Sequence, residues 1–219
     1  MPFSRRRRVV RRRKPVRRLR RRRRRFFKRA GRGSFRVKLT RFVSITQDIS
    51  KTTQFSFEIT PSDFTEFATL ADAFEAVRFT RAKVTVLPQQ NVSNNSTSLI
   101  PAYCMFPWHK ELPTVATFNG FLSIDRAKCF RGTQVGIQHY VPSTLDSIQT
   151  KGAAGYEVQS VQTKYKPTIQ ISGGASTVVL YTGALGMQAL SDAPENAQAH
   201  YNIKIDMWCT FINQTSFNK

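Results

Sequence analysis

The residues with the clearest chemistry are the arginines and lysines of the first 33 positions. This segment holds seventeen Arg, two Lys and no Asp or Glu, a net charge of +19. Guanidinium groups form paired hydrogen bonds with phosphate, and their planar faces stack on bases. A chain of nineteen cations also binds polyanions by releasing their condensed counterions, with steep salt dependence and little sequence preference. We therefore predict a nucleic-acid-binding arm at residues 1–33.

The basic clusters of the arm also have the form of a nuclear localisation signal, which importins recognise. They are "RRRR" at residues 5–8 and "RRRKP" at residues 11–15. Phe26 and Phe27 have two interpretations, because they either stack on exposed bases or anchor the arm to the body. The side chains predicted to bind nucleic acid and to direct nuclear import are Arg5, Arg6, Arg7, Arg8, Arg11, Arg12, Arg13, Lys14, Arg17, Arg18, Arg20, Arg21, Arg22, Arg23, Arg24, Arg25, Lys28, Arg29 and Arg32.

The rest of the chain has an ordinary composition. The whole chain carries +22, which leaves +3 for residues 34–219, from sixteen basic and thirteen acidic side chains. Repulsion between like charges and a scarcity of apolar side chains predict that the free arm is disordered. The remaining 186 residues are enough for one domain with a sizeable core. We expect the arm to end at residue 33 and the domain to span 34–219.

The sequence contains no secretory signal and no apolar run long enough to span a bilayer. We therefore expect a soluble intracellular product that does not insert into membranes. Cys104, Cys129 and Cys209 are widely spaced and odd in number, so they are interpreted as reduced thiols in the core rather than as a disulfide framework.

Nothing else in the sequence predicts catalysis, a metal site or a cofactor. There is no glycine-rich phosphate loop and no paired-cysteine zinc spacing. His109, His139 and His200 are far apart, and His109 in "PWHKELP" is interpreted as an ordinary loop residue. Asp63 and Glu66 fall in the first turns of a predicted helix, where carboxylates complement the helix dipole. We expect a protein that is not an enzyme, with no catalytic residue, metal ligand or cofactor.

The elements that must carry these residues are mostly strands. Alternating apolar and polar residues predict strands at 34–42, 54–60, 74–88 and 201–211, with weaker candidates at 98–106, 129–141, 156–165 and 176–185. In the strand at 74–88 the apolar parity changes, which predicts a bulge around Thr80 and Arg81. One short helix is predicted, with Thr60 as its N-cap, Pro61 at its first position and a stripe formed by Phe64, Phe67, Ala71 and Phe74. Eight strands with long loops and almost no helix predict an all-β fold, a single eight-stranded jelly roll or β-sandwich.

A second basic set lies on two of the predicted strands. Its members are Arg36, Lys38 and Arg41 on the first strand, and Arg78, Arg81 and Lys83 on the strand at 74–88. If both strands belong to one sheet, these side chains form a surface continuous with the arm that contacts nucleic acid. The alternative is that they protect sheet edges from pairing with other chains.

Together these features resemble the capsid proteins of circoviruses. The resemblance covers the whole chain in order: the Arg-rich arm, the eight-stranded body, "FEAVRFTRAKVTVLP" in the middle and "YNIKIDMWCTFIN" near the C-terminus. The length and the short junction between arm and body are most similar to the cyclovirus branch. The segment "TPSDFTEFATLADAF" departs from the pattern, because its predicted helix is longer than the matching loop of porcine-type circoviruses.

The resemblance implies a jelly roll whose copies close into a T=1 icosahedral shell around circular single-stranded DNA. The arm would face the genome in the virion and direct the protein to the host nucleus before assembly. The outer loops would attach to a host cell-surface receptor or glycan. With about sixty copies, the arms supply on the order of a thousand positive charges, the scale of a very small single-stranded genome.

Two other functional classes remain open at this point. One is a non-viral protein that condenses nucleic acid and has a β-barrel body, which would bind DNA or RNA without forming closed particles. The other is a glycan-active jelly-roll enzyme with a targeting tail. An enzyme of that class needs carboxylates that face one cleft, and the thirteen acidic residues are scattered along the chain.

Overall fold

The structure is a computed structural model that describes residues 33–89, 100–113, 117–151, 157–193 and 197–215. The predicted arm therefore lies outside the described residues, except for Gly33. In the described part of the chain, no helix is long and apolar enough to cross a membrane.

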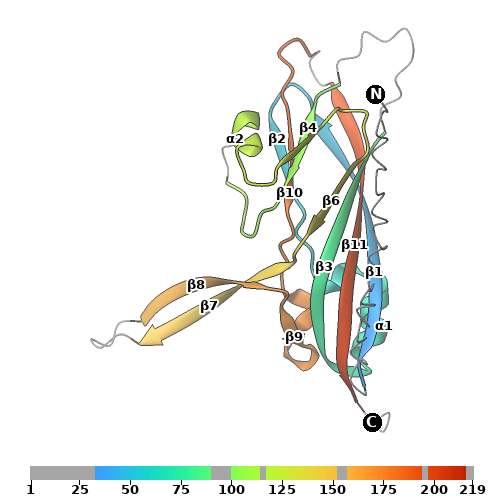
Figure 1. Cartoon of the computed structure of the whole chain (residues 1–219), viewed down its shortest axis with the longest axis vertical. Coiled ribbons are helices and arrows are strands. Elements are labelled where there is room, and N and C mark those ends of the chain that lie inside the picture. The colour runs from blue at the N-terminus through green and yellow to red at the C-terminus, as the bar shows by residue number, and fades with distance from the viewer. Residues whose placement is uncertain (1–32, 90–99, 114–116, 152–156, 194–196, 216–219) are drawn as a thin grey trace, which may run out of the picture.

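Two antiparallel sheets form the body (Figure 1). The long sheet has the strand order β1-β11-β3-β6 and the short sheet has the order β2-β10-β4-β5. These eight strands in this order form a jelly roll, so the predicted fold is confirmed. The strands of the long sheet are β1 (Phe35–Asp48), β11 (Gln198–Gln214), β3 (Phe74–Pro88) and β6 (Gly136–Tyr140). Those of the short sheet are β2 (Thr53–Ser56), β10 (Ala184–Met187), β4 (Tyr103–Phe106) and β5 (Lys128–Phe130).

The strand boundaries differ from the sequence prediction in several places. The predicted strand at 176–185 was largely wrong, because it begins in a 3₁₀ turn, η3 (Ala175–Thr177), and only its last two residues belong to β10. The predicted strand at 129–141 is two strands, β5 and β6, which belong to different sheets. The predicted strand at 156–165 is β8 (Glu157–Tyr165), which pairs with β7 (Ser143–Lys151) in a hairpin that projects from the body (Figure 1). The strand β9 (Thr168–Gln170) pairs with β3 beside the main order of the long sheet.

The alternation of the long strands buries one face of the long sheet. On β11 the side chains of Tyr201, Ile203, Ile205, Met207, Cys209 and Phe211 are all in the core, as the sequence predicts. The pairing of β3 with β11 passes from Arg81–Trp208 to Phe79–Cys209, which leaves Thr80 unpaired. This extra residue is the predicted bulge, and the Thr80 hydroxyl donates a 2.9 Å hydrogen bond to the Trp208 carbonyl.

The predicted helix divides into a 3₁₀ turn, η1 (Pro61–Asp63), and the helix α1 (Thr65–Ala71). The backbone at Phe64 is extended, which separates the two. The carboxylate of Asp63 accepts a 2.7 Å hydrogen bond from the Thr60 amide, so Asp63 caps the turn. Phe64, Phe67 and Ala71 are buried in the hydrophobic core, as expected from the stripe.

A second helix, α2 (Phe118–Leu122), covers the short sheet and was not predicted. Its Phe121 ring stacks on Phe106 with centroids 5.2 Å apart, in a cluster that also contains Cys104 and Ala184. A Cβ at Gly186 would overlap the Phe121 ring, so only glycine permits this approach. Two further 3₁₀ turns, η2 (Ile171–Gly173) and η3 (Ala175–Thr177), follow β9.

Candidate nucleic-acid interface

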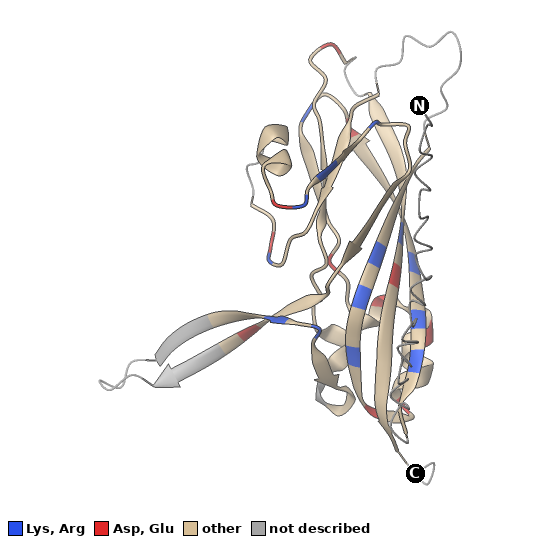
Figure 2. Ribbon diagram, viewed as in Figure 1, with Lys and Arg blue, Asp and Glu red and all other residues tan. Residues whose placement is uncertain are grey.

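Five of the six predicted basic side chains of the body lie on one face. Arg36 and Lys38 on β1, and Arg78, Arg81 and Lys83 on β3, project from the surface of the long sheet that faces away from the core. Figure 2 shows these cations as bands on the two strands that flank β11. The shared sheet that the sequence hypothesis required is therefore present.

The central strand β11 contributes to the same face. Outward-facing Lys204 and Trp208 alternate with its buried residues, and the register places Trp208 between Lys38 on one side and Arg81 on the other. The Arg81 guanidinium lies 5.2 Å from the centre of the Trp208 ring, in the geometry of a cation–π contact. We define the basic face as the outward surface of the long sheet formed by Arg36, Lys38, Arg78, Arg81, Lys83 and Lys204, with Trp208 at its centre.

Sequence reasoning missed Lys204 and Trp208. The signal was present, because both occupy the polar positions of the alternation in "YNIKIDMWCTF". A side chain at such a position lies on the solvent side of the sheet, next to its cross-strand neighbours. Only the register shows that those neighbours are the predicted cations.

One acidic residue, Asp206, lies in the middle of the basic face and contacts two of its lysines. Asp206 is 5% exposed and accepts a 2.8 Å hydrogen bond from the Thr40 hydroxyl. The ammonium groups of Lys38 and Lys204 lie 3.7 and 3.8 Å from the same carboxylate oxygen. The carboxylate therefore holds two lysines over the strand while they stay about half exposed to solvent.

Arg41 does not belong to the basic face, which corrects its grouping with Arg36 and Lys38. Its position has the same parity as the buried Leu39 and Ile45. Its guanidinium donates a 2.9 Å hydrogen bond to the Asp63 carboxylate, in an ion pair with the turn that precedes α1. Because the charge of Arg41 is matched within the fold, this residue links β1 to the helical segment.

His139 on β6 extends the face beyond β3. Its ring nitrogen Nδ1 lies 2.9 Å from the guanidinium nitrogen Nη2 of Arg81. Because an arginine only donates, the imidazole accepts through an unprotonated nitrogen. Desolvation first, and then the charges of Arg81, Lys83 and Lys128, lower the pKa of His139. The ring is therefore sensitive to the positive potential of the surface.

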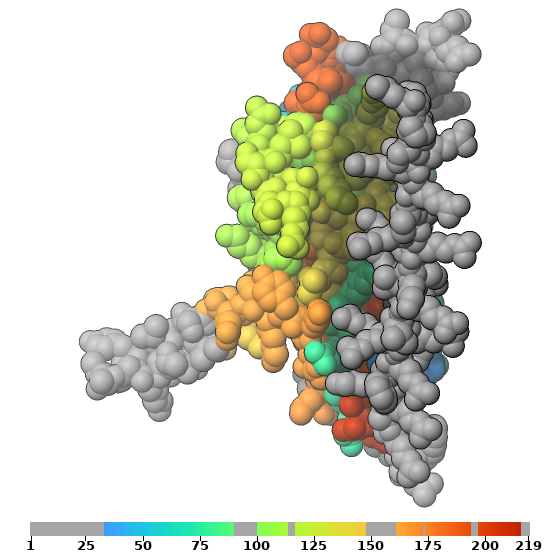
Figure 3. Space-filling view, in the orientation of Figure 1, coloured from blue at the N-terminus to red at the C-terminus, as the bar shows by residue number. Residues whose placement is uncertain are grey.

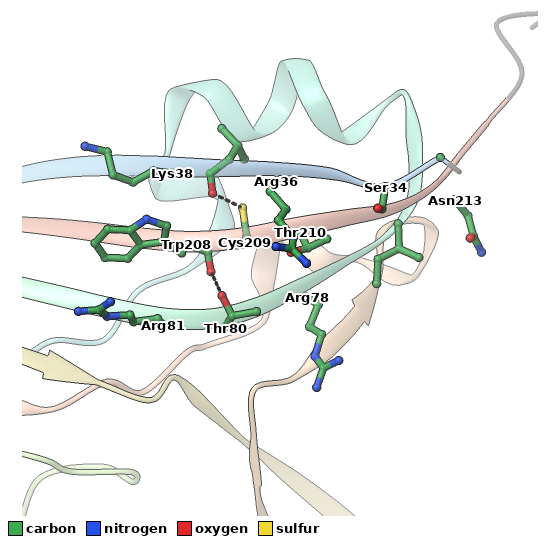
Figure 4. Close-up of a pocket in the computed structure, with 13 residues that line it drawn as sticks. Ser34, Arg36, Lys38, Arg78, Thr80, Arg81, Trp208, Cys209, Thr210 and Asn213 are labelled. Carbon is green, nitrogen blue, oxygen red and sulfur yellow. Dashed lines mark hydrogen bonds between the residues drawn. The ribbon is translucent and has the colours of Figure 1, made fainter. Parts of the chain in front are cut away.

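An open groove of about 940 Å³ crosses the end of the basic face (Figure 4). Its lining includes Arg36, Lys38, Arg78 and Arg81 together with Gly33, the first residue that the structure describes. The carbonyl of Gly33 accepts a 3.1 Å hydrogen bond from the Gln214 amide, and its φ of +86° favours glycine. Gly33 is therefore held beside the end of β11, where it lines the groove.

Cys104 and Cys129 lie on the short sheet, whereas Cys209 on β11 is among the residues that line the groove. Cys104 and Cys209 are buried core thiols as expected, and burial raises the pKa of each to about 12. Cys129 is exposed, so its assignment to the core was wrong, because β5 lies at the edge of the short sheet. Among the residues that the structure describes, no group of three His, Cys, Asp or Glu side chains is placed to hold a metal ion.

His109 lies in a loop, as expected, and contacts the base of the hairpin. Its Nδ1 lies 2.9 Å from the Ser143 hydroxyl, and its ring meets Tyr165 edge to face at 5.0 Å. Burial lowers the pKa of His109. These contacts give the imidazole a structural role where β7 and β8 leave the body. Figure 3 shows the coloured base of this hairpin projecting from the body.

Comparison with solved structures shows the same fold in viral capsid proteins. The BFDV capsid protein, solved as a 60-mer, superposes with a TM-score of 0.63 at 15% identity, over 85% of this chain and 97% of that chain. The same protein solved as a decamer gives a TM-score of 0.53 at 16% identity, over 81% and 98% of the two chains. A solved structure of Cucumber Leaf Spot Virus gives a TM-score of 0.53 at 13% identity, over 86% of this chain and 53% of that chain.

The comparison at the level of sequence covers almost the whole chain, including the arm that precedes the described residues. The match to the family of circovirus capsid proteins runs from residue 4 to residue 215. It therefore includes the arm, both sheets of the jelly roll and the basic face. The chain belongs to the circovirus capsid protein family.

Proposed function

We propose that this chain closes into a T=1 icosahedral shell that packages circular single-stranded DNA, with the basic face and the arm directed at the genome. The observation that carries the proposal is the continuity of the two: the arm joins the body at Gly33, on the rim of the groove that Arg36, Lys38, Arg78 and Arg81 line. Cations from both sources can therefore contact one strand of nucleic acid.

The chemistry of the basic face favours a single strand over a duplex. Trp208 offers an aromatic surface among cations, and stacking of bases on aromatic side chains is a general mode of single-strand binding. The lysines and arginines around it bind phosphate without reading sequence. The proposed interface therefore holds DNA by charge and stacking, with little sequence preference.

Self-assembly is supported by the BFDV capsid protein, which has this fold and was solved as a 60-mer and as a decamer. The projecting hairpin supports it as well, since Val161 and Tyr165 are 64% and 55% exposed. A two-stranded hairpin with exposed apolar side chains gains stability when another surface covers it. A neighbouring copy of the chain is the proposed cover.

The arm has two proposed partners that use the same cations at different times. Host importins bind the basic clusters of the newly made protein and carry it into the nucleus, where the genome then displaces them. The outer loops of the finished virion attach to a cell-surface receptor or glycan. Because importins and DNA compete for the same arginines, packaged DNA shields the signal.

Electron microscopy and nuclease protection of the full-length protein test the proposal. We expect closed particles that protect DNA, and a variant lacking residues 1–32 that keeps the body's fold but protects far less. A matched variant with lysine at every arm arginine keeps the charge and should retain most of the protected DNA. Monomers in the presence of nucleic acid would refute the shell, and salt-sensitive complexes without closed particles would instead indicate a nucleic-acid-condensing protein.

The nuclear-import part of the proposal needs a separate test. Residues 1–33 fused to a fluorescent protein should accumulate in the nucleus. A fusion in which residues 5–8 and 11–14 are replaced by glutamine should accumulate less, because it keeps only the eleven cations of residues 17–32. Equal nuclear accumulation of both fusions would contradict the assignment of these clusters as the signal.

A further inference from the structure

Two of the three cysteines face each other across neighbouring strands. The antiparallel register of β4 and β5 pairs Cys104 directly with Cys129. Directly opposed residues in an antiparallel pair have Cα atoms about 4.5 to 5.5 Å apart, which lies within the range that a disulfide spans. Both thiols are free in this structure.

The register beside the cysteines is held by a packed aromatic pair. Tyr103 and Phe130 are the next pair along the ladder, and their rings stack with centroids 5.4 Å apart. Tyr103 is fully buried, so a slip of β5 against β4 would break this packing. Because successive side chains alternate between faces, Cys104 and Cys129 lie together on the opposite face, toward α2.

The two thiols differ in access to solvent. Cys104 is buried beneath α2, whereas Cys129 is exposed on β5, the edge strand of the short sheet. A small disulfide reagent can therefore reach Cys129 but not Cys104. We propose that Cys104 and Cys129 are a redox-active pair that forms a reversible cross-strand disulfide when the protein enters an oxidising solution.

The reaction needs a low-molecular-weight disulfide such as oxidised glutathione. The Cys129 thiolate attacks one sulfur of the reagent, forms a mixed disulfide and releases one glutathione thiolate. Cys104 then loses its proton to solvent and attacks the Cys129 sulfur, which releases the second glutathione thiolate. The two protein thiols together lose two electrons and two protons, and the reagent is reduced to two thiols.

Closure is the slow step, because burial raises the pKa of Cys104 to about 12. Below that pH the thiolate fraction of Cys104 rises tenfold with each pH unit, so the closing rate should rise in the same proportion. The mixed disulfide on Cys129 should therefore accumulate near neutral pH and convert to the internal disulfide as the pH is raised.

The bond would tether the edge strand β5 and close the connection at residues 105–128, which carries α2 over the short sheet. A disulfide that closes a loop of this length typically shifts the folding equilibrium by about a hundredfold. The cell interior keeps thiols reduced and the extracellular medium does not. The pair would thus reinforce the short sheet outside the cell and release it on return to reducing conditions.

The test is peptide mapping by mass spectrometry of the full-length protein after incubation with oxidised glutathione at a series of pH values. We expect one disulfide, between Cys104 and Cys129, that is reversed by dithiothreitol. Cys209→Ala is the matched control and should form the same bond, while Cys129→Ser and Cys104→Ala should not. Cys104→Ala should stop at the mixed disulfide.

Two results would overturn the proposal. One is a mixed disulfide on Cys129 that persists at pH 9 to 10 in the parent protein. The other is oxidation that joins Cys129 to Cys129 of a second copy. If a variant fails to fold, the parent protein can be oxidised in its native state, unfolded and then alkylated. The internal disulfide protects both Cys104 and Cys129 from alkylation. Without that disulfide, Cys104 becomes labelled.

Discussion

Removing the three cations of β3 should weaken the salt dependence of DNA binding by a defined amount. Arg78, Arg81 and Lys83 all project from the outward surface of the long sheet. Each phosphate contact with a single strand contributes about 0.7 to the slope of log affinity against log salt, so replacing all three with glutamine should reduce the slope by about 2. A fourfold rise in salt should then cost the parent roughly fifteen- to twentyfold more affinity than it costs the variant.

The assay is a fluorescence titration of the shell domain, residues 33–219, with oligothymidylate at several salt concentrations. Every buried hydrophobic residue of the described core lies between 39 and 211, so removing the arm removes none of it. The chain has two tryptophans. A Trp108→Phe background therefore leaves Trp208 as the reporter within the basic face, where stacking of a base quenches its emission.

The matched control removes the same charge elsewhere. Lys110, Arg126 and Arg131 are exposed and lie off the long sheet. Their replacement by glutamine should leave the slope close to that of the parent. An unchanged slope in the β3 variant, or an equal loss in the control, would refute the assignment of the basic face.

Further predictions follow from single contacts. Binding of DNA should raise the depressed pKa of His139, because the phosphates offset the charges of the neighbouring cations. The affinity for DNA should therefore rise as the pH falls through that pKa. NMR titrations of the His139 ring resonances measure the pKa, and an unchanged pKa in the complex would contradict the prediction. Gly186→Ala should destabilise the body by about 1–3 kcal/mol in denaturant unfolding, because the new methyl overlaps Phe121, and a change within error would count against the packing described. Asp63→Ala should lower the free energy of unfolding by about 1–2 kcal/mol, because the cap of the turn and the ion pair with Arg41 are both lost. Arg41→Gln should leave the affinity for DNA unchanged, and a loss of affinity would place Arg41 in the interface after all.

The sequence predicted the long strands well, because each buries one face and so repeats with a period of two. Strands β1, β3 and β11 have that pattern over nine residues or more, and even the bulge at Thr80 was visible as a change of parity. Such strands are specified locally, since a slip of one residue would expose the whole apolar set.

The short sheet was harder to predict for a physical reason. All four residues of β4 and of β10 are buried, because the core covers one face and α2 with its loops covers the other. A strand buried on both faces shows no alternation. The division of residues 129–141 into β5 and β6 likewise depends on which sheet each part joins, which only the tertiary fold determines.

The sequence predicted part of the candidate site. The cations of β1 and β3 were identified from their positions on two predicted strands. Their convergence depends on β11, which comes last in the chain and lies between those strands. The same register brought in Lys204 and Trp208 and excluded Arg41. Cys129 was misplaced for a related reason, since an edge position is a property of the sheet and not of the strand.

The most direct measurement of the central claim is a cryo-EM map of nuclease-treated particles assembled from the full-length chain. We predict a shell of about sixty copies whose basic face lines the interior, with polynucleotide density against Trp208 and the surrounding cations. A closed shell with the basic face on its outer surface, or with that face clear of nucleic acid, would contradict the account.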